Sequence, residues 1–256
     1  MIEFLDTVFA TPAAKEGTNG AALFQFLMEC CPDIEVIEFG TMTETNFVVN
    51  FRFMGDHDMA YRFSSSSSGC SLYMFVKDLN GTTIIAGETY SQVKNCEVFK
   101  YGLSSDNTLI NVHVIRDAGK CAILHFAYSY YNMYFTALKC VDMCSGDIVI
   151  VSNCSTHSTS ISSNKLNVSF SGYRCINGTY ASLSVYYLYN IGSDNGFTRM
   201  HPVQVYGNGF LGQPLNPTMV YYTVCGGDGV FIPAFTDFSV GGVRFLSIGY
   251  YAIRLS

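Results

Sequence analysis

The feature that most constrains this chain is a long succession of short segments with the composition of β-strands. From residue 36 to residue 153, β-branched and aromatic residues recur in short runs that are separated by Gly, Asp, Asn and Ser. Such a succession is typical of antiparallel sandwiches and barrels, and not of folds in which strands alternate with helices. We therefore expect an all-β protein with one short N-terminal helix, built from antiparallel β-sandwich domains of jelly-roll or immunoglobulin-like type.

The single expected helix lies near the start of the chain. Thr18 or Asn19 is suited to cap it, and Pro32 stands just beyond its end. Residues 21–31 are apolar nearly all round, which is typical of a helix that is covered on most sides. The cover is either the rest of the fold or a neighbouring subunit. Four of its side chains are therefore candidate interface residues: Leu23, Phe24, Phe26 and Leu27.

Residues 152–165 have the composition of a linker, because ten of these fourteen residues are Ser, Thr or Asn. We expect them to separate an N-terminal domain of residues 1–151, made of the helix and antiparallel strands, from a C-terminal β domain of residues 166–256. Within the first domain, Asn80-Gly81 is the strongest hairpin signal, since this dipeptide suits a two-residue turn between antiparallel strands.

The small fraction of charged residues narrows the range of possible functions. Charged residues make up 13% of the sequence, against about 25% in ordinary globular proteins. The net charge is −6 and the 14 Lys and Arg residues are scattered, which argues against nucleic acid as a partner. We expect no membrane insertion, because no run of 18 apolar residues occurs. The first ten residues predict no signal peptide.

The ten cysteines are expected to be reduced thiols that pack as small apolar residues, because the expected compartment is not oxidising. One set has spacing that suits a tetrahedral zinc site: Cys140, Cys144, Cys154 and His157. Since Cys140 falls inside an expected strand, this set is only a weak candidate, and we predict no metal and no other cofactor.

Two further polar groups invite a chemical interpretation. Gly55-Asp56-His57-Asp58 offers two carboxylates and an imidazole to a metal, but the same residues are typical of a hairpin turn. His113 and His125 flank one turn. With Ala118-Gly119 as a two-residue loop, they are expected on opposite faces of the sheet, unless a bulge at Gly119 shifts the register.

Tyrosine is abundant, with 18 Tyr, 20 Phe and no Trp. In strands, half of the clustered tyrosines should point outward, and exposed tyrosine is enriched at protein interfaces. The candidate interface tyrosines are Tyr130, Tyr131, Tyr186, Tyr187 and Tyr250.

The C-terminal stretch GDGVFIPAFTDFSVGGVRFLSIGYYAIRLS, residues 227–256, resembles the ends of structural proteins of tailed bacteriophages. It has a Gly-rich turn, a short hairpin and a final strand of small and apolar residues, and the charge-poor strands before it are similar in style. The resemblance implies a virion component of the tail, baseplate or head surface, assembled in the host cytoplasm. Its partners would be copies of itself or other virion proteins.

No sequence motif indicates catalysis. A nucleophile elbow and a phosphate-binding loop are both absent, and no spacing singles out a pair of carboxylates. We therefore expect a non-enzymatic structural subunit that acts through contacts between subunits. The alternative is a β-sandwich module that binds a carbohydrate or a cell-surface receptor, with tyrosines lining its groove.

Overall fold

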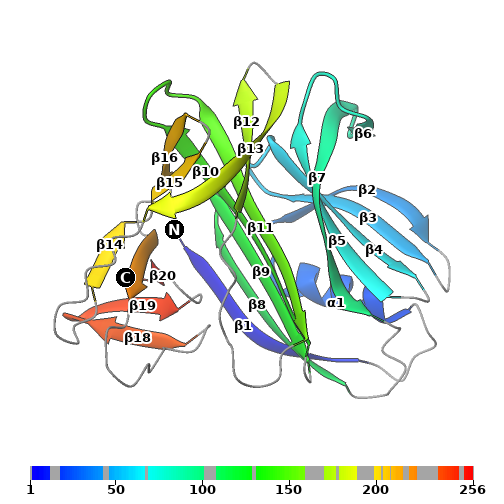
Figure 1. Ribbon diagram of the computed structural model, residues 1–256. Helices are drawn as coiled ribbons and strands as arrows, with labels where there is room; N and C mark the ends of the chain where they lie inside the picture. Colours follow the sequence, from blue (N-terminus) through cyan, green and yellow to red (C-terminus); the bar gives the residue numbers. More distant parts are fainter. Residues whose placement is uncertain are drawn as a thin grey trace.

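A computed structural model describes residues 2–11, 18–42, 46–66, 69–100, 108–128, 131–158, 170–176, 179–188, 199–202, 204–207, 209–215, 219–223, 236–247 and 251–255. Within these ranges the chain forms one helix and three sheets, and every pairing of neighbouring strands is antiparallel (Figure 1). The expected fold class, an all-β antiparallel protein with a short N-terminal helix, is confirmed.

The first of the two large sheets has six strands in the order β2-β3-β4-β5-β7-β6. Their bounds are β2 Ile34–Met42, β3 Phe47–Phe53, β4 Met59–Ser66, β5 Gly69–Lys77, β6 Thr83–Ile85 and β7 Glu88–Lys100. Residues alternate between buried and partly exposed along β4 and β5, so that one face of this sheet carries much of the core.

The second large sheet has nine strands in the order β1-β8-β9-β10-β11-β12-β13-β15-β16. The N-terminal part of the chain contributes β1 Glu3–Ala10, β8 Leu109–Asp117, β9 Cys121–Tyr128, β10 Tyr131–Asp142 and β11 Ile148–Ser158. The C-terminal part contributes β12 Phe170–Ile176, β13 Thr179–Leu188, β15 Gln204–Gly207 and β16 Phe210–Pro214. This sheet curls until β16 also pairs with β10.

A smaller third sheet has five strands in the order β14-β17-β20-β19-β18. Their bounds are β14 Arg199–Pro202, β17 Met219–Thr223, β18 Asp237–Val240, β19 Val243–Ser247 and β20 Tyr251–Arg254. The end of the chain, β20, lies between β17 and β19, which anchors it on both sides. A segment that is paired in this way is held in place by its neighbouring strands.

The helix α1, Thr18–Cys30, lies between the two large sheets (Figure 1). The Phe24 ring packs on Phe51 of β3 and Phe63 of β4, with ring centroids 5.2 and 5.6 Å apart. Tyr61 of β4 meets Phe135 of β10 edge to face, so the same core joins both sheets. The cover of the apolar helix is therefore the fold itself.

The predicted linker is wrong over residues 152–158, which are the second half of β11; residues 159–169 lie outside the described ranges. The boundary predicted after residue 151 does not separate two sheets either, because β12, β13, β15 and β16 continue the sheet of β8–β11. Ser and Thr are compatible with a strand when cross-strand neighbours pair its backbone. Composition alone therefore mistook a paired strand for a linker.

The predicted hairpin at Asn80-Gly81 is also wrong. This dipeptide lies in the turn between β5 and β6, where the Asn80 N–H donates to Asp78 Oδ1 at 3.0 Å, but β5 pairs with β7 and not with β6. The two-residue hairpin turn is Ala86-Gly87, which joins β6 to β7 with φ angles of 54° and 78°. Both angles are positive, as the favoured two-residue hairpin turn requires.

Candidate functional site

Three polar residues line up across neighbouring strands at one edge of the nine-stranded sheet. Asp6 of β1 pairs with His113 of β8, and His113 pairs with His125 of β9. Residues directly opposite one another in an antiparallel ladder project to the same face. The sheet register therefore brings together a carboxylate and two imidazoles that are far apart in the sequence.

The side chains of this row are in hydrogen-bonding contact. His113 Nε2 lies 3.1 Å from Asp6 Oδ1, and His113 Nδ1 lies 2.9 Å from His125 Nδ1. The Phe4 ring stacks parallel to the His113 ring, with centroids 6.4 Å apart. A neutral His113 that donates its Nε2–H to the carboxylate keeps an unprotonated Nδ1, which accepts the Nδ1–H of His125.

Burial favours the neutral form of His113. The His113 side chain is 13% exposed, and His125 is buried, whereas the Asp6 side chain is largely exposed. Burial lowers the pKa of His113, and the nearby Asp6 carboxylate offsets only part of that effect. At neutral pH the row therefore presents a neutral His113 imidazole, in contact with His125, beside the Asp6 carboxylate.

Sequence reasoning separated this pair because it assumed a two-residue loop. The turn has three residues, 118–120, since Asp117 pairs with Cys121, and Gly119 takes a φ of 67°. A shift of one residue moves every side chain of a strand to the other face. Gly119 was the available signal, because a glycine in the left-handed conformation is typical of three-residue hairpin loops.

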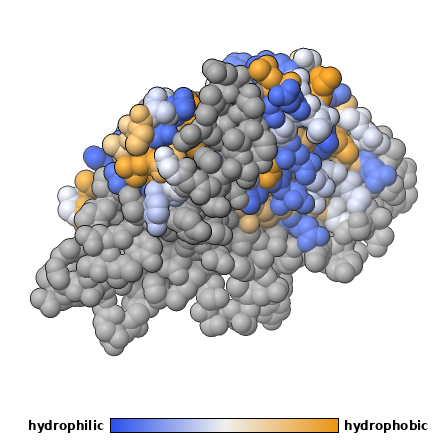
Figure 2. All heavy atoms as spheres, turned by 45° about the horizontal axis from the view of Figure 1, so that its top comes forward, coloured by the Kyte–Doolittle hydropathy of each residue, from blue (hydrophilic) through white to orange (hydrophobic). Residues whose placement is uncertain are grey.

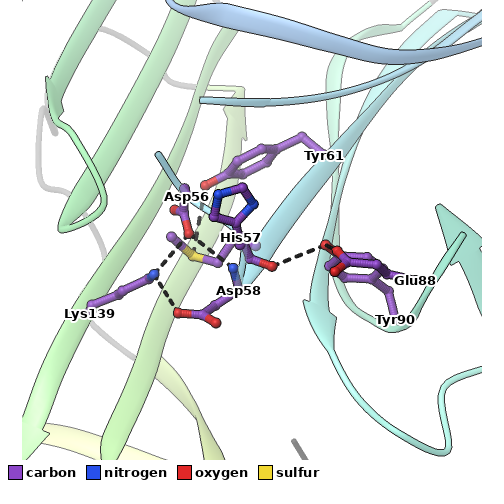
Figure 3. A network of polar contacts seen from close by, with 8 residues as sticks. Asp56, His57, Asp58, Tyr61, Glu88, Tyr90 and Lys139 are labelled. Carbon is purple, nitrogen blue, oxygen red and sulfur yellow. Dashed lines mark hydrogen bonds and ion pairs between the residues drawn. The ribbon is translucent and has the colours of Figure 1, made fainter. Parts of the chain in front are cut away.

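The Asp56–Asp58 segment, considered above as a metal site, instead binds a lysine (Figure 3). Lys139 Nζ of β10 lies 2.8 Å from Asp56 Oδ1 and 2.7 Å from Asp58 Oδ2. Asp56 and Lys139 are buried, whereas half of the Asp58 side chain is exposed. The Lys139 ammonium group thus occupies the position between the two carboxylates that a metal ion would take. The segment itself is the turn between β3 and β4.

The ionisation of this group follows from burial and pairing. Burial lowers the pKa of Lys139, but Asp56 and Asp58 outweigh burial and raise it above its ordinary value. Burial raises the pKa of Asp56, and Lys139 opposes that shift. Tyr90 adds a further constraint, because its hydroxyl lies 3.1 Å from the His57 carbonyl oxygen and 3.0 Å from Glu88 Oε2. The group fastens the β3–β4 turn to β10.

The cysteines of the proposed zinc set do not converge. Cys140 is buried in β10 opposite Val149, and Cys144 is exposed in the turn that follows β10. Cys154 forms a disulfide with Cys96, which corrects the expectation that all cysteines are reduced. His157 pairs with Asn132, far along the ladder from Cys140. Across the described ranges, no group of three or more His, Cys, Asp or Glu is arranged to hold a metal ion.

A small pocket of about 110 Å³ opens beside Arg116 of β8 and the end of α1, and its lining residues are Glu3, Phe4, Leu5, Cys30, Cys31, Val114 and Arg116. Arg116 is buried and forms ion pairs with Glu3 and Asp33. Burial raises the pKa of Cys31 to about 11, although Arg116 opposes the shift. This thiol is therefore protonated at neutral pH and is a poor nucleophile.

The predicted interface residues have different outcomes. Leu23, Phe24 and Leu27 are fully buried in the core, so their assignment to a subunit interface is wrong. Phe26 is partly buried and packs on Phe9 of β1. The tyrosine predictions concern side chains outside the described set: Tyr131 lies in β10, Tyr186 and Tyr187 lie in β13, and Tyr130 and Tyr250 fall between the described ranges.

Neither a family model nor a curated protein sequence significantly matches this chain. In the part of the chain that the structure describes, no helix has the length and apolarity needed to cross a membrane. Function must therefore be inferred from the geometry of the described residues.

Proposed function

We propose that this chain is a non-enzymatic structural subunit that works by contact with other protein chains, as a component of a bacteriophage virion. The resemblance of residues 227–256 to virion proteins motivates the biological setting. The observation that carries the assembly function is the edge strand β1, which pairs with β8 on one side and stands at the end of the strand order.

β1 carries few of the usual features that prevent edge strands from pairing with other chains, and its two charged residues, Glu3 and Asp6, both lie in its first half. It has eight residues, its register with β8 is continuous from Glu3 to Ala10, and it contains no Lys, Pro or Gly. Proteins usually protect such edges by short strands, bulges, Lys or Pro. An unprotected edge supports a function in which another strand adds to the sheet.

The exposed apolar side chains at this edge lie at the C-terminal end of β1. Val8 is 49% exposed, and Leu109, which pairs with Ala10 across the ladder, is 60% exposed. Figure 2 shows hydrophobic and hydrophilic residues interspersed over the face that it presents, rather than one continuous apolar area. An edge strand with an apolar end therefore supports assembly better than a broad surface patch does.

We take the added strand to be β1 of a second copy. A two-fold axis at Phe9 would place Val8 opposite Ala10 of the second copy, which joins the two apolar ends. Glu3 and Asp6 would then lie away from the centre of the contact, so that like charges are kept apart. Because β1 ends at Ala10, the two strands would pair with each other over residues 8–10 of each copy.

Light scattering during size-exclusion chromatography tests the proposal. The wild-type protein is expected to elute as a discrete oligomer at micromolar concentration, and Val8→Lys is expected to elute as a monomer with an unchanged circular dichroism spectrum. Leu79→Lys is the matched control, because Leu79 is also apolar and is even more exposed, at 71%, but lies in a turn. A monomeric wild-type protein, or an oligomer that Val8→Lys leaves intact, would overturn assembly through β1.

A further inference from the structure

We propose that His113 and His125 form a binding site for a divalent transition metal ion, Cu²⁺ or Ni²⁺, with Asp6 orienting the His113 ring. The two ligands are the Nδ1 atoms that face each other across β8 and β9. The ion would take the place of the proton that His125 Nδ1 donates between them, and neutral His125 would then carry its proton on Nε2. This inference does not depend on the proposed assembly function.

The backbone holds the two ligands in place. β8 is paired with β1 on one side and β9 on the other, and β9 is paired with both β8 and β10. The two histidines therefore project from interior strands of a large sheet. Two ligands on rigid, directly opposed positions lose little conformational freedom when an ion binds.

The spacing of the nitrogen atoms, which is that of a hydrogen bond, is compatible with a Cu²⁺ or Ni²⁺ site. A bond of about 2.0–2.1 Å from each imidazole nitrogen places two ligands at a right angle about 2.9 Å apart, and two tetrahedral ligands about 3.3 Å apart. The observed Nδ1–Nδ1 distance is 2.9 Å. It matches neighbouring positions of the square-planar or tetragonal sites that Cu²⁺ and Ni²⁺ prefer, and fits tetrahedral Zn²⁺ less well.

Asp6 supplies the outer contact that metal-binding histidines usually have. Its Oδ1 lies 3.1 Å from His113 Nε2, the ring nitrogen that faces away from the proposed metal. A carboxylate that accepts the Nε2–H holds the tautomer in which Nδ1 is unprotonated, and it makes that nitrogen a stronger ligand. Asp6 also brings one negative charge close to the divalent ion.

The described residues add no third His, Cys, Asp or Glu to this pair. Water would therefore complete the coordination, which leaves positions open for exchange. Among first-row divalent ions, imidazole ligands bind Cu²⁺ most tightly, followed by Ni²⁺. The expected order of affinity is thus Cu²⁺, then Ni²⁺, with Zn²⁺ below Cu²⁺.

Titration of the full, metal-stripped chain with CuCl₂ tests the site directly. One equivalent is expected to bind with an electron paramagnetic resonance spectrum that shows two nitrogen ligands. His113→Asn and His125→Asn should each abolish this signal. His57→Asn is the matched control and should keep it, because His57 is an exposed residue of the β3–β4 turn and is not in the row of Asp6, His113 and His125.

A histidine variant could lose Cu²⁺ binding simply because it unfolds, so a second variant that keeps both histidines is needed. Asp6→Asn keeps both ligands and is expected to weaken Cu²⁺ binding roughly 10–100-fold, as losses of outer-shell partners do. Saturating Ni²⁺, at about one hundred times its dissociation constant, should raise the unfolding midpoint of the wild type by roughly 5 °C and that of His125→Asn by much less.

Two results would overturn the proposal. One is the absence of a bound equivalent of Cu²⁺ in the wild type, which would leave the two histidines as a hydrogen-bonded pair. The other is a two-nitrogen signal that survives both His113→Asn and His125→Asn, which would place the bound ion on other histidines.

Discussion

Lys139 of β10 and Asp56 of the β3–β4 turn form a buried ion pair whose charged atoms lie 2.8 Å apart, although the two residues belong to different sheets. Two other links join the same sheets. The Cys96–Cys154 disulfide connects β7 to β11, and the Tyr173 hydroxyl of β12 donates to the Val93 carbonyl oxygen of β7 at 2.9 Å. The sandwich is therefore held by polar and covalent links as well as by its core.

Removal of Lys139 should strongly destabilise the protein. Lys139→Met leaves the buried Asp56 carboxylate without its cation, which costs about 3–5 kcal/mol in comparable cases. Asp58→Asn is the control: half of the Asp58 side chain is exposed, so its loss should cost less than about 1 kcal/mol. Urea unfolding of both variants measures the difference. Equal losses would show that Asp56 and Lys139 are not the central pair.

The same lysine should make the protein sensitive to alkali. Asp56 and Asp58 hold the pKa of Lys139 above its ordinary value, so the folded state binds this proton more tightly than the unfolded state. The resulting stabilisation is complete below pH 10.5, the ordinary value, and is lost as the pH rises through the folded pKa. The quantity to measure is the difference in unfolding free energy between wild type and Lys139→Met from pH 9 to pH 12. A difference that does not shrink above pH 10.5 would contradict this assignment.

Reduction of the Cys96–Cys154 disulfide should lower stability by about 4 kcal/mol, because it closes a loop with a sequence separation of 58 residues. The double variant Cys96→Ser, Cys154→Ser should unfold at the same urea concentration with or without reductant. Cys144→Ser is the control and should behave like the wild type, since Cys144 is a free, exposed thiol. If thiol titration of the oxidised protein finds Cys96 and Cys154 free, the pairing is wrong.

Truncation of the helix core should reduce stability and leave assembly unchanged. Leu27→Ala removes a fully buried side chain and should cost about 2–5 kcal/mol. Leu79→Ala, at an exposed turn position, should change stability by less than about 0.5 kcal/mol. Urea unfolding and light scattering together check both statements. A dissociated but equally stable Leu27→Ala protein would restore the helix as an interface element.

Local patterns located most elements but missed several strands, among them β1 and β7. β7 carries polar residues at Gln92, Asn95 and Glu97 on its exposed side, and Cys96 and Val98 are buried in the core near its end. β1 lies before the helix and is an edge strand with a largely exposed face. A strand with one face in water ordinarily shows clean alternation. In β7 two register shifts against β5 interrupt that pattern, and in β1 the neighbouring apolar residues Phe4 and Leu5 interrupt it.

The candidate site depended on a single turn. The strands that hold His113 and His125 were predicted, and so was the turn between them. A two-residue loop would place the histidines on opposite faces of the sheet, whereas the observed three-residue loop places them on the same face. The part that Asp6 plays could not be predicted from neighbouring residues, since its contact with His113 arises only when β1 pairs with β8.

The sequence by itself determined the fold class, the helix and its apolar character, because alternation, capping residues and turn residues act over a few neighbouring positions. The tertiary structure alone decided which strands are neighbours, that residues 152–158 belong to a sheet, and that Lys139 meets Asp56. These outcomes depend on contacts between distant segments. Such contacts are set by the joint burial of many side chains and by the register of each turn, and no short stretch of sequence contains that information.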